Sequence, residues 1–204
     1  MPLVDPVPSE PYDLFKTLNG EVTWLHTVWE LYIQFYGTSD ENYELMNEVA
    51  PQFFAILKIM LFDELAMILN RLTDKAITLG KANASLEQLI EQIDPERDSE
   101  LARSLRAKLE KIRADYGAFR TWRDKKLSHN DLQVAIQRES STLPGITRQQ
   151  AEDAIREVAE FMNEYSLHIL YGQQAYRPFM IAHGDGTALM QFLKRATESR
   201  NNVT

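Results

Sequence analysis

The chain has 204 residues and contains no cysteine. It therefore forms no disulfide, offers no thiol nucleophile and cannot hold zinc on thiolates. With 44% hydrophobic and 25% charged residues, its composition is otherwise that of a soluble globular protein. We expect stability to come from packing alone, and we expect the protein to be cytoplasmic.

Long hydrophobic runs are also missing. The most apolar stretch, FFAILKIMLF from Phe53 to Phe62, has ten residues and is followed by Asp63. A membrane-spanning helix needs about 20 such residues, so we interpret this stretch as a buried helix and expect no membrane partner. Residues 1–12 contain four prolines and lack the basic start and apolar centre of a signal peptide. They are predicted to form an extended arm.

No strand-like alternation, repeat or low-complexity tract is visible, so we predict an all-α fold. Apolar residues at spacings of three and four indicate a helical bundle of four to five main helices. It forms one domain over residues 13–172, and a loop and short helix over 173–204 pack on the same domain. The long helices are expected at about 13–36, 38–74 with a kink or restart at Pro51, 95–127 and 147–172, with a short helix at 85–93 and another at 187–196. Polar residues that favour helix starts are Thr38 with Glu41, Ser85, and Thr147 with Gln150.

Charge is unevenly distributed along the chain. The net charge is −8, which argues against indiscriminate binding of polyanions by the whole surface. Residues 1–74 hold three basic and twelve acidic side chains, whereas residues 97–126 hold ten basic and five acidic ones. We therefore expect a basic strip on an acidic body.

The third long helix carries an unusual arginine. Its apolar stripe continues by four residues from Phe119 to Arg123 and then to Leu127. A buried guanidinium is costly, so Arg123 must be paired, hydrated or next to an opening. The earlier stripe residues are Leu101, Leu105, Leu109 or Lys108, Ile112 and Tyr116.

His129 follows Arg123 by six residues, about 240° around a continuing helix. A helix end after Leu127, favoured by Asn130 and Asp131, or a two-fold dimer interface would bring the two cations together. Such a pair suits phosphoryl chemistry, because imidazole moves protons near neutral pH and a guanidinium stabilises phosphate charge. The alternative is structural: both side chains can satisfy the free carbonyls at a helix end.

The segment RDKKLSH, Arg123 to His129, resembles the signature of the HEPN superfamily. With FRTWRDKKLSHND around it and LFDELAMILNRLTD in the preceding helix, the chain is similar to the abortive-infection AbiU branch. This resemblance implies a dimer with a composite, metal-independent ribonuclease site at the subunit interface. Such proteins act as toxins or phage-defence effectors, so RNA is the expected substrate and an antitoxin or defence protein a further expected partner.

Carried over residue by residue, the resemblance makes Arg123 the phosphate-stabilising cation and His129 the general acid/base or orienting group. Asp124 would orient one of them. Some relatives have a tyrosine for nucleotidylation two residues after the histidine, where this chain has Asp131. The candidates for binding RNA are Lys125, Lys126, Arg120 and Asn130.

Other sites receive less support. The pairs His129/Asp131 and His183/Asp185 each lack a third ligand nearby, and no Walker or GxSxG sequence occurs, so we expect no metal and no cofactor. Phe119 and Trp122 are expected to be core or dimer anchors rather than base-stacking platforms. The alternative function is a noncatalytic helical module that binds nucleotide, RNA or protein.

Overall fold

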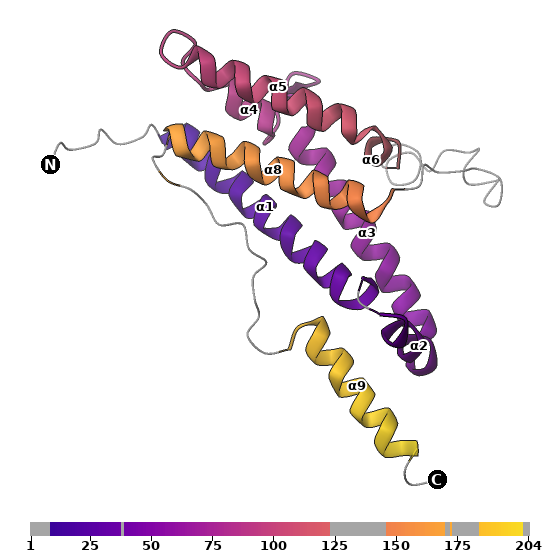
Figure 1. Cartoon of the computed structure of the whole chain (residues 1–204). Coiled ribbons are helices and arrows are strands. Elements are labelled where there is room, and N and C mark those ends of the chain that lie inside the picture. Colours follow the sequence, from indigo (N-terminus) through magenta and orange to yellow (C-terminus); the bar gives the residue numbers. More distant parts are fainter. Residues whose placement is uncertain (1–8, 38, 123–145, 170–171, 173–183, 202–204) are drawn as a thin grey trace, which may run out of the picture. The chain divides into compact units, whose positions relative to one another are not determined.

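The computed structural model describes residues 9–37, 39–122, 146–169, 172 and 184–201 (Figure 1). The all-α prediction is confirmed, since helices make up nearly all of the described structure. The helices are α1 (Ser9–Tyr36), α2 (Asp40–Val49), α3 (Pro51–Thr73), α4 (Leu86–Glu91), α5 (Ser99–Asp115), α6 (Gly117–Trp122), α8 (Arg148–Ile169) and α9 (Gly186–Asn201).

Contacts divide the chain into two compact units. One contains residues 1–23 and 66–176, and the other contains residues 24–65 and 177–204. These units cut across the predicted domain of residues 13–172, because α1 and α3 each contribute to both. The boundaries of that domain stay a prediction.

The first unit is built on α5 and α8, which lie side by side and run in opposite directions (Figure 1). Apolar spacings of three and four in the sequence predict a stripe on α8 that begins at Ala151, and this stripe is buried from Ala151 to Tyr165. Phe15 of α1 stacks on the Tyr165 ring, with centroids 5.8 Å apart. The burial of both apolar stripes is what holds these helices together, since each half-exposed helix can remove only one face from water.

The second unit has a small core of its own. It joins α1, α2, α3 and α9 through one buried side chain from each helix: Phe35, Met46, Phe54 and Met190. Asp185 caps α9 by accepting a hydrogen bond from the backbone N–H of Ala188 at 2.8 Å. The apolar spacing of the sequence predicts Trp29, Tyr32 and Tyr36 on the buried stripe of this part of α1, and that prediction was wrong. Val28 and Phe35 are buried instead. The other three side chains are only partly buried, and the Tyr32 ring contacts the rings of Trp29 and Tyr36.

Several helix ends differ from the prediction. The first helix begins at Ser9, inside the predicted extended arm, because a proline in the first turn removes no hydrogen bond from the helix. Ser39, not Thr38, caps α2 by accepting from the backbone N–H of Asn42. The caps at Ser85 and at Thr147 with Gln150 are confirmed, and α3 restarts at Pro51 as expected.

The predicted loop of residues 75–84 contains a small hairpin. Strands β1 (Ile77–Thr78) and β2 (Lys81–Ala82) pair in antiparallel register. The two turn residues, Leu79 and Gly80, both have positive φ, at 50° and 76°. Turns with positive φ at both central residues match the right-handed twist of short hairpins. Glycine adopts positive φ without steric cost, which favours it at such positions.

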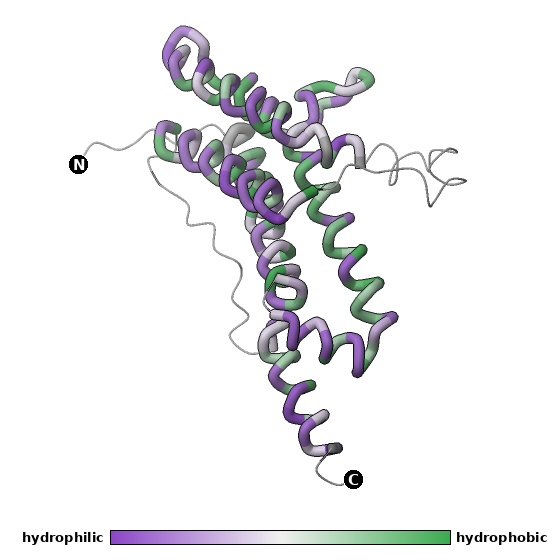
Figure 2. Tube along the Cα trace, turned by 45° about the vertical axis from the view of Figure 1, so that its right-hand side comes forward, coloured by the Kyte–Doolittle hydropathy of each residue, from purple (hydrophilic) through white to green (hydrophobic). Residues whose placement is uncertain are grey.

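The interpretation of Phe53 to Phe62 as a buried helix was wrong for much of its length. Phe53, Ile56, Ile59 and Met60 are exposed, and Figure 2 shows α3 as mostly hydrophobic. A helix that is apolar all round can bury only the face that meets its neighbours. Among the described residues, no helix is long and apolar enough to cross a membrane.

Replacing Phe161 by Ala should lower the free energy of unfolding by about 3–5 kcal/mol, because its fully buried ring leaves a cavity between helices. Leu167→Ala, in the same helix but 48% exposed, should cost less than about 1 kcal/mol. Denaturant unfolding of both variants measures the difference. Equal losses would contradict the packing described for α8.

Candidate functional site

The buried stripe of α5 continues into α6, and its last described residue, Phe119, comes four residues before Arg123. Leu101, Leu105, Leu109 and Ile112 are buried, as are Tyr116 and Phe119 beyond the end of α5. The prediction for this stripe is therefore confirmed as far as Phe119, with Leu109 rather than Lys108 on the buried side. Phe119 is a core residue, as expected. The proposed site residues Arg123, Asp124, Lys125, Lys126, His129 and Asn130 lie outside the described residues, and Arg120 is exposed at the edge of the described part.

The predicted single helix over residues 95–127 is wrong in two respects. It begins at Ser99, because Asp94 and the following residues form a turn in which Asp94 accepts from the backbone N–H of Glu96. It is also interrupted, since α5 ends at Asp115 and α6 begins at Gly117. Tyr116 between them has φ −103° and ψ 17°, away from helical values. Glycine weakens a helix at this point, yet the apolar spacing runs on unbroken.

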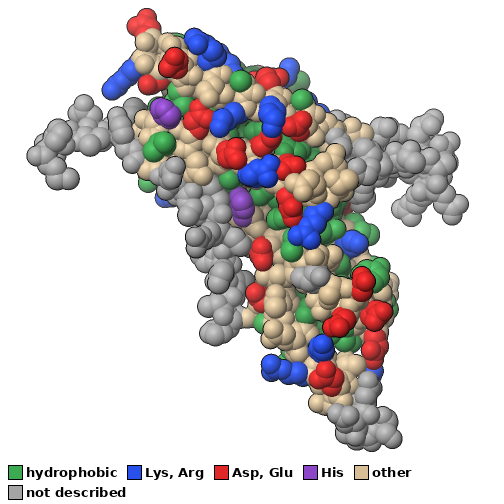
Figure 3. All heavy atoms as spheres, in the orientation of Figure 1, with side chains coloured by type: hydrophobic (Ala, Val, Ile, Leu, Met, Phe, Trp, Pro, Cys, Tyr) green, Lys and Arg blue, Asp and Glu red, His purple; other side chains and the backbone are tan. Residues whose placement is uncertain are grey.

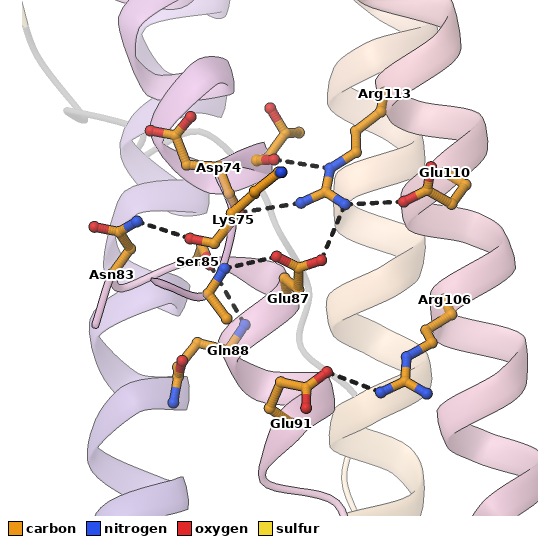
Figure 4. Close-up of polar contacts among 12 residues, drawn as sticks. Asp74, Lys75, Asn83, Ser85, Glu87, Gln88, Glu91, Arg106, Glu110 and Arg113 are labelled. Atoms are coloured by element: carbon orange, nitrogen blue, oxygen red, sulfur yellow. Dashed lines mark hydrogen bonds and ion pairs between the residues drawn. The ribbon is translucent and has the colours of Figure 1, made fainter. Parts of the chain in front are cut away.

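Arg113 lies in this stretch, and its guanidinium joins α5 to α3 and α4 (Figure 4). It donates to the backbone carbonyls of Thr73 and Asp74 at 3.0 and 3.2 Å, at the end of α3. It also donates to the carboxylates of Glu110 and Glu87, at 2.9 and 3.2 Å. All of these acceptors suit the planar, five-donor fork of arginine.

Glu87 completes this arrangement by accepting from the backbone N–H of Ala76 at 2.6 Å. The hydrogen bond from Arg113 is the main reason why the pKa of Glu87 is lowered. Burial by itself would lower the pKa of Arg113, but its bonds to Glu87 and Glu110 outweigh that effect and the pKa is raised. Both groups are therefore held in their charged forms.

A second polar link ties α3 to α6. Asn70 is 3% exposed, and its side-chain nitrogen lies 2.7 Å from the carbonyl oxygen of Ala66 and 3.2 Å from that of Phe119. Between the two helices lies a void of about 10 Å³ lined by Asn70, Thr73, Arg113 and their neighbours. It has room for no more than about one water molecule, so this contact is tight.

Tyr116 faces a polar hollow of about 330 Å³ between α5 and α8. Burial first, and then the charges of Glu157, Asp115 and Asp153, raise the pKa of its hydroxyl well above its usual range. Within the described residues, this hydroxyl has no hydrogen-bond partner. The hollow holds two cations, Lys111 and Arg156, against those three carboxylates, so its net charge of −1 does not favour a phosphate.

The expected basic strip is largely neutralised where the structure describes it. Figure 3 shows cationic and anionic side chains interspersed over α5 and α8. Lys108 pairs with Glu164, Lys111 with Glu157, and Arg106 with Glu91. The local sequence count could not foresee this, because the partners come from α4 and α8. In the same part of the chain, no group of three or more His, Asp or Glu side chains is placed to hold a metal ion.

The all-α fold agrees with what the resemblance to HEPN proteins implies. The sequence matches the AbiU2 family model of HEPN proteins over residues 13–185, and the chain therefore belongs to that family. No curated protein and no solved structure matches this sequence. The family match covers α1 from Asp13 onward, the described elements from α2 to α8 and the whole Arg123 to His129 segment.

Arg113→Ala should lower the free energy of unfolding by about 3–5 kcal/mol, because it leaves Glu87 and two helix-end carbonyls without their charged donor. Arg106→Ala removes an exposed pair whose side chains are 60% and 50% accessible, and should cost less than about 1 kcal/mol. Chemical denaturation compares the two. A small loss for Arg113→Ala would mean that its bonds contribute little.

The contribution of Glu87 should depend on pH. Its pKa is lowered on folding, so its stabilising effect is present above its ordinary value of 4.5 and is lost as the pH falls through the folded-state pKa. The free energy of unfolding of the wild type should exceed that of Glu87→Gln by about 1–3 kcal/mol at pH 7, and this difference should shrink toward zero in acid. Glu91→Gln serves as the exposed control. A difference that does not change with pH would contradict this assignment.

Proposed function

We propose that this protein is a metal-independent endoribonuclease whose Arg123 and His129 act at a dimer interface, and that it serves as a phage-defence or toxin effector. The observation that carries the proposal is the AbiU2 family match across a segment that retains both residues. The buried stripe of α5 and α6 supports it, because a helix anchored up to Phe119 gives Arg123 a fixed starting point four residues on.

The chemistry requires only groups that the chain and the RNA supply. The 2′-hydroxyl of the RNA attacks the adjacent phosphorus and gives up its proton to a base, while the bond to the 5′-oxygen breaks and that oxygen takes up a proton. The products are a 2′,3′-cyclic phosphate and a 5′-hydroxyl. His129 moves a proton, and Arg123 stabilises the charge that grows on the phosphoryl oxygens.

Binding is proposed to rest on a few cations close to the reacting phosphate. Lys125, Lys126 and Arg120 would contact flanking phosphates, together with the neutral amide of Asn130. The paired cations of α5 are poorly suited to this task, since Lys108 and Lys111 already bind carboxylates of α8. Asp124 would orient Arg123 or His129.

Purified wild-type protein should cleave RNA in the presence of a chelator and leave 5′-hydroxyl ends. Arg123→Ala and His129→Ala should each reduce the cleavage rate by about 10²–10⁴-fold while remaining folded. Arg106→Ala and His168→Ala are the matched controls, because both side chains are exposed on the described helices and should leave cleavage unchanged. Gel analysis of labelled RNA gives the rates.

Two results would overturn the proposal: no cleavage by the wild type, or equal cleavage by the wild type and both site variants. Retained RNA binding without cleavage would favour the noncatalytic module instead. Light scattering tests the interface separately, because a strictly monomeric protein that still cleaves RNA would rule out a site shared by two subunits.

A further inference from the structure

Asn70 occupies a position where its chemistry can be assigned from its partners. The two atoms next to its side-chain nitrogen are carbonyl oxygens, of Ala66 within α3 and of Phe119 in α6. Carbonyl oxygens only accept hydrogen bonds, so the amide must turn its NH₂ group, with both hydrogens, toward them. A neutral side chain of this length that offers two donors from one atom is found only in asparagine.

The second acceptor, the carbonyl of Phe119, lies close in sequence to the proposed site. Phe119 belongs to the last turn of α6, where helix carbonyls are commonly bonded by side chains from other elements. It is also four residues before Arg123. The ring of Phe119 is buried and meets Tyr116 edge-on at 5.8 Å, so both the side chain and the carbonyl of this residue are fixed.

We infer that Asn70 is a positioning residue: by holding the Phe119 carbonyl it fixes the end of α6, and through it the place from which the chain continues to Arg123. This inference rests on the proposed ribonuclease function for its catalytic consequence. Its structural consequence does not, since Asn70 would fix α6 whether or not RNA is cleaved.

The neighbouring Thr73 offers a matched control. It is also a buried polar residue of α3, but its hydroxyl donates to the carbonyls of Leu69 and Asn70 within the same helix. Thr73→Val removes buried hydrogen bonds whose acceptors all belong to α3, not to α6. Asn70→Asp keeps the shape of the side chain but turns oxygen lone pairs toward two carbonyl oxygens, unless the acid is protonated.

Hydrogen exchange of the Arg120 to Trp122 amides gives a readout that does not depend on activity. Asn70→Asp should lower their protection factors by at least about 10-fold at pH 7, with a smaller change in α8, whereas Thr73→Val should leave α6 like the wild type. Because burial raises the pKa of a carboxyl group, protection in Asn70→Asp should partly return as the pH is lowered and the neutral acid donates again.

Cleavage measurements complete the test. Asn70→Asp should lower kcat about 10²-fold with little change in KM for RNA, the scale expected when a catalytic group is displaced by about 1 Å, and Thr73→Val should lower neither. Unchanged or equally reduced α6 protection in the two variants would overturn the inference, as would wild-type cleavage by an Asn70→Asp protein whose α6 is loosened. If the wild type does not cleave RNA, the proposed function fails, and the exchange data alone decide whether Asn70 fixes α6.

Discussion

One guanidinium connects three helices of the first unit through residues that lie 26 to 40 positions apart in the sequence. Arg113 of α5 bonds the last carbonyls of α3 and the carboxylate of Glu87 in α4, so three helices share a single side chain. Helix ends expose carbonyls that need donors, and a partly buried carboxylate needs a cation. Arg113 meets both needs at once. The direction in which α5 leaves this point then sets where Tyr116, Phe119 and α6 lie.

After Arg113 along the chain, the backbone is interrupted while the spacing of the apolar side chains is not. Gly117 permits a break between α5 and α6, yet the apolar side chains on either side keep the spacing of one helix and all enter the core. Asn70 then supports α6, the shorter of the two helices, by a hydrogen bond to the backbone carbonyl of Phe119. A six-residue helix has little stability of its own, so its position depends on these tertiary contacts. The proposed site follows directly after it.

The sequence predicted those features that depend on local pattern. The stripes of α5 and α8 and the caps at Ser85 and Thr147 arise from residues a few positions apart, and they were correct. The hairpin at Ile77 was missed because two-residue strands are too short to show alternation. The bonds of Arg113 to α3 and α4, and that of Asn70 to α6, join residues 26 to 49 positions apart, a separation at which periodicity carries no information. The predicted site residues from Arg123 to Asn130 lie outside the described residues, so their arrangement stays a prediction.

The ion pairs made by the cations of α5 also affect how the binding of a polyanion would depend on salt concentration. When a protein binds nucleic acid, the dependence of affinity on salt reflects the counterions that its cations displace from phosphates. Arg106, Lys108, Lys111 and Arg113 already have carboxylates as counterions within the protein. They would displace few ions from a bound strand. Although α5 is rich in lysine and arginine, it would thus add little to the salt dependence of binding. That dependence would instead reflect the few cations that follow the helix in the sequence.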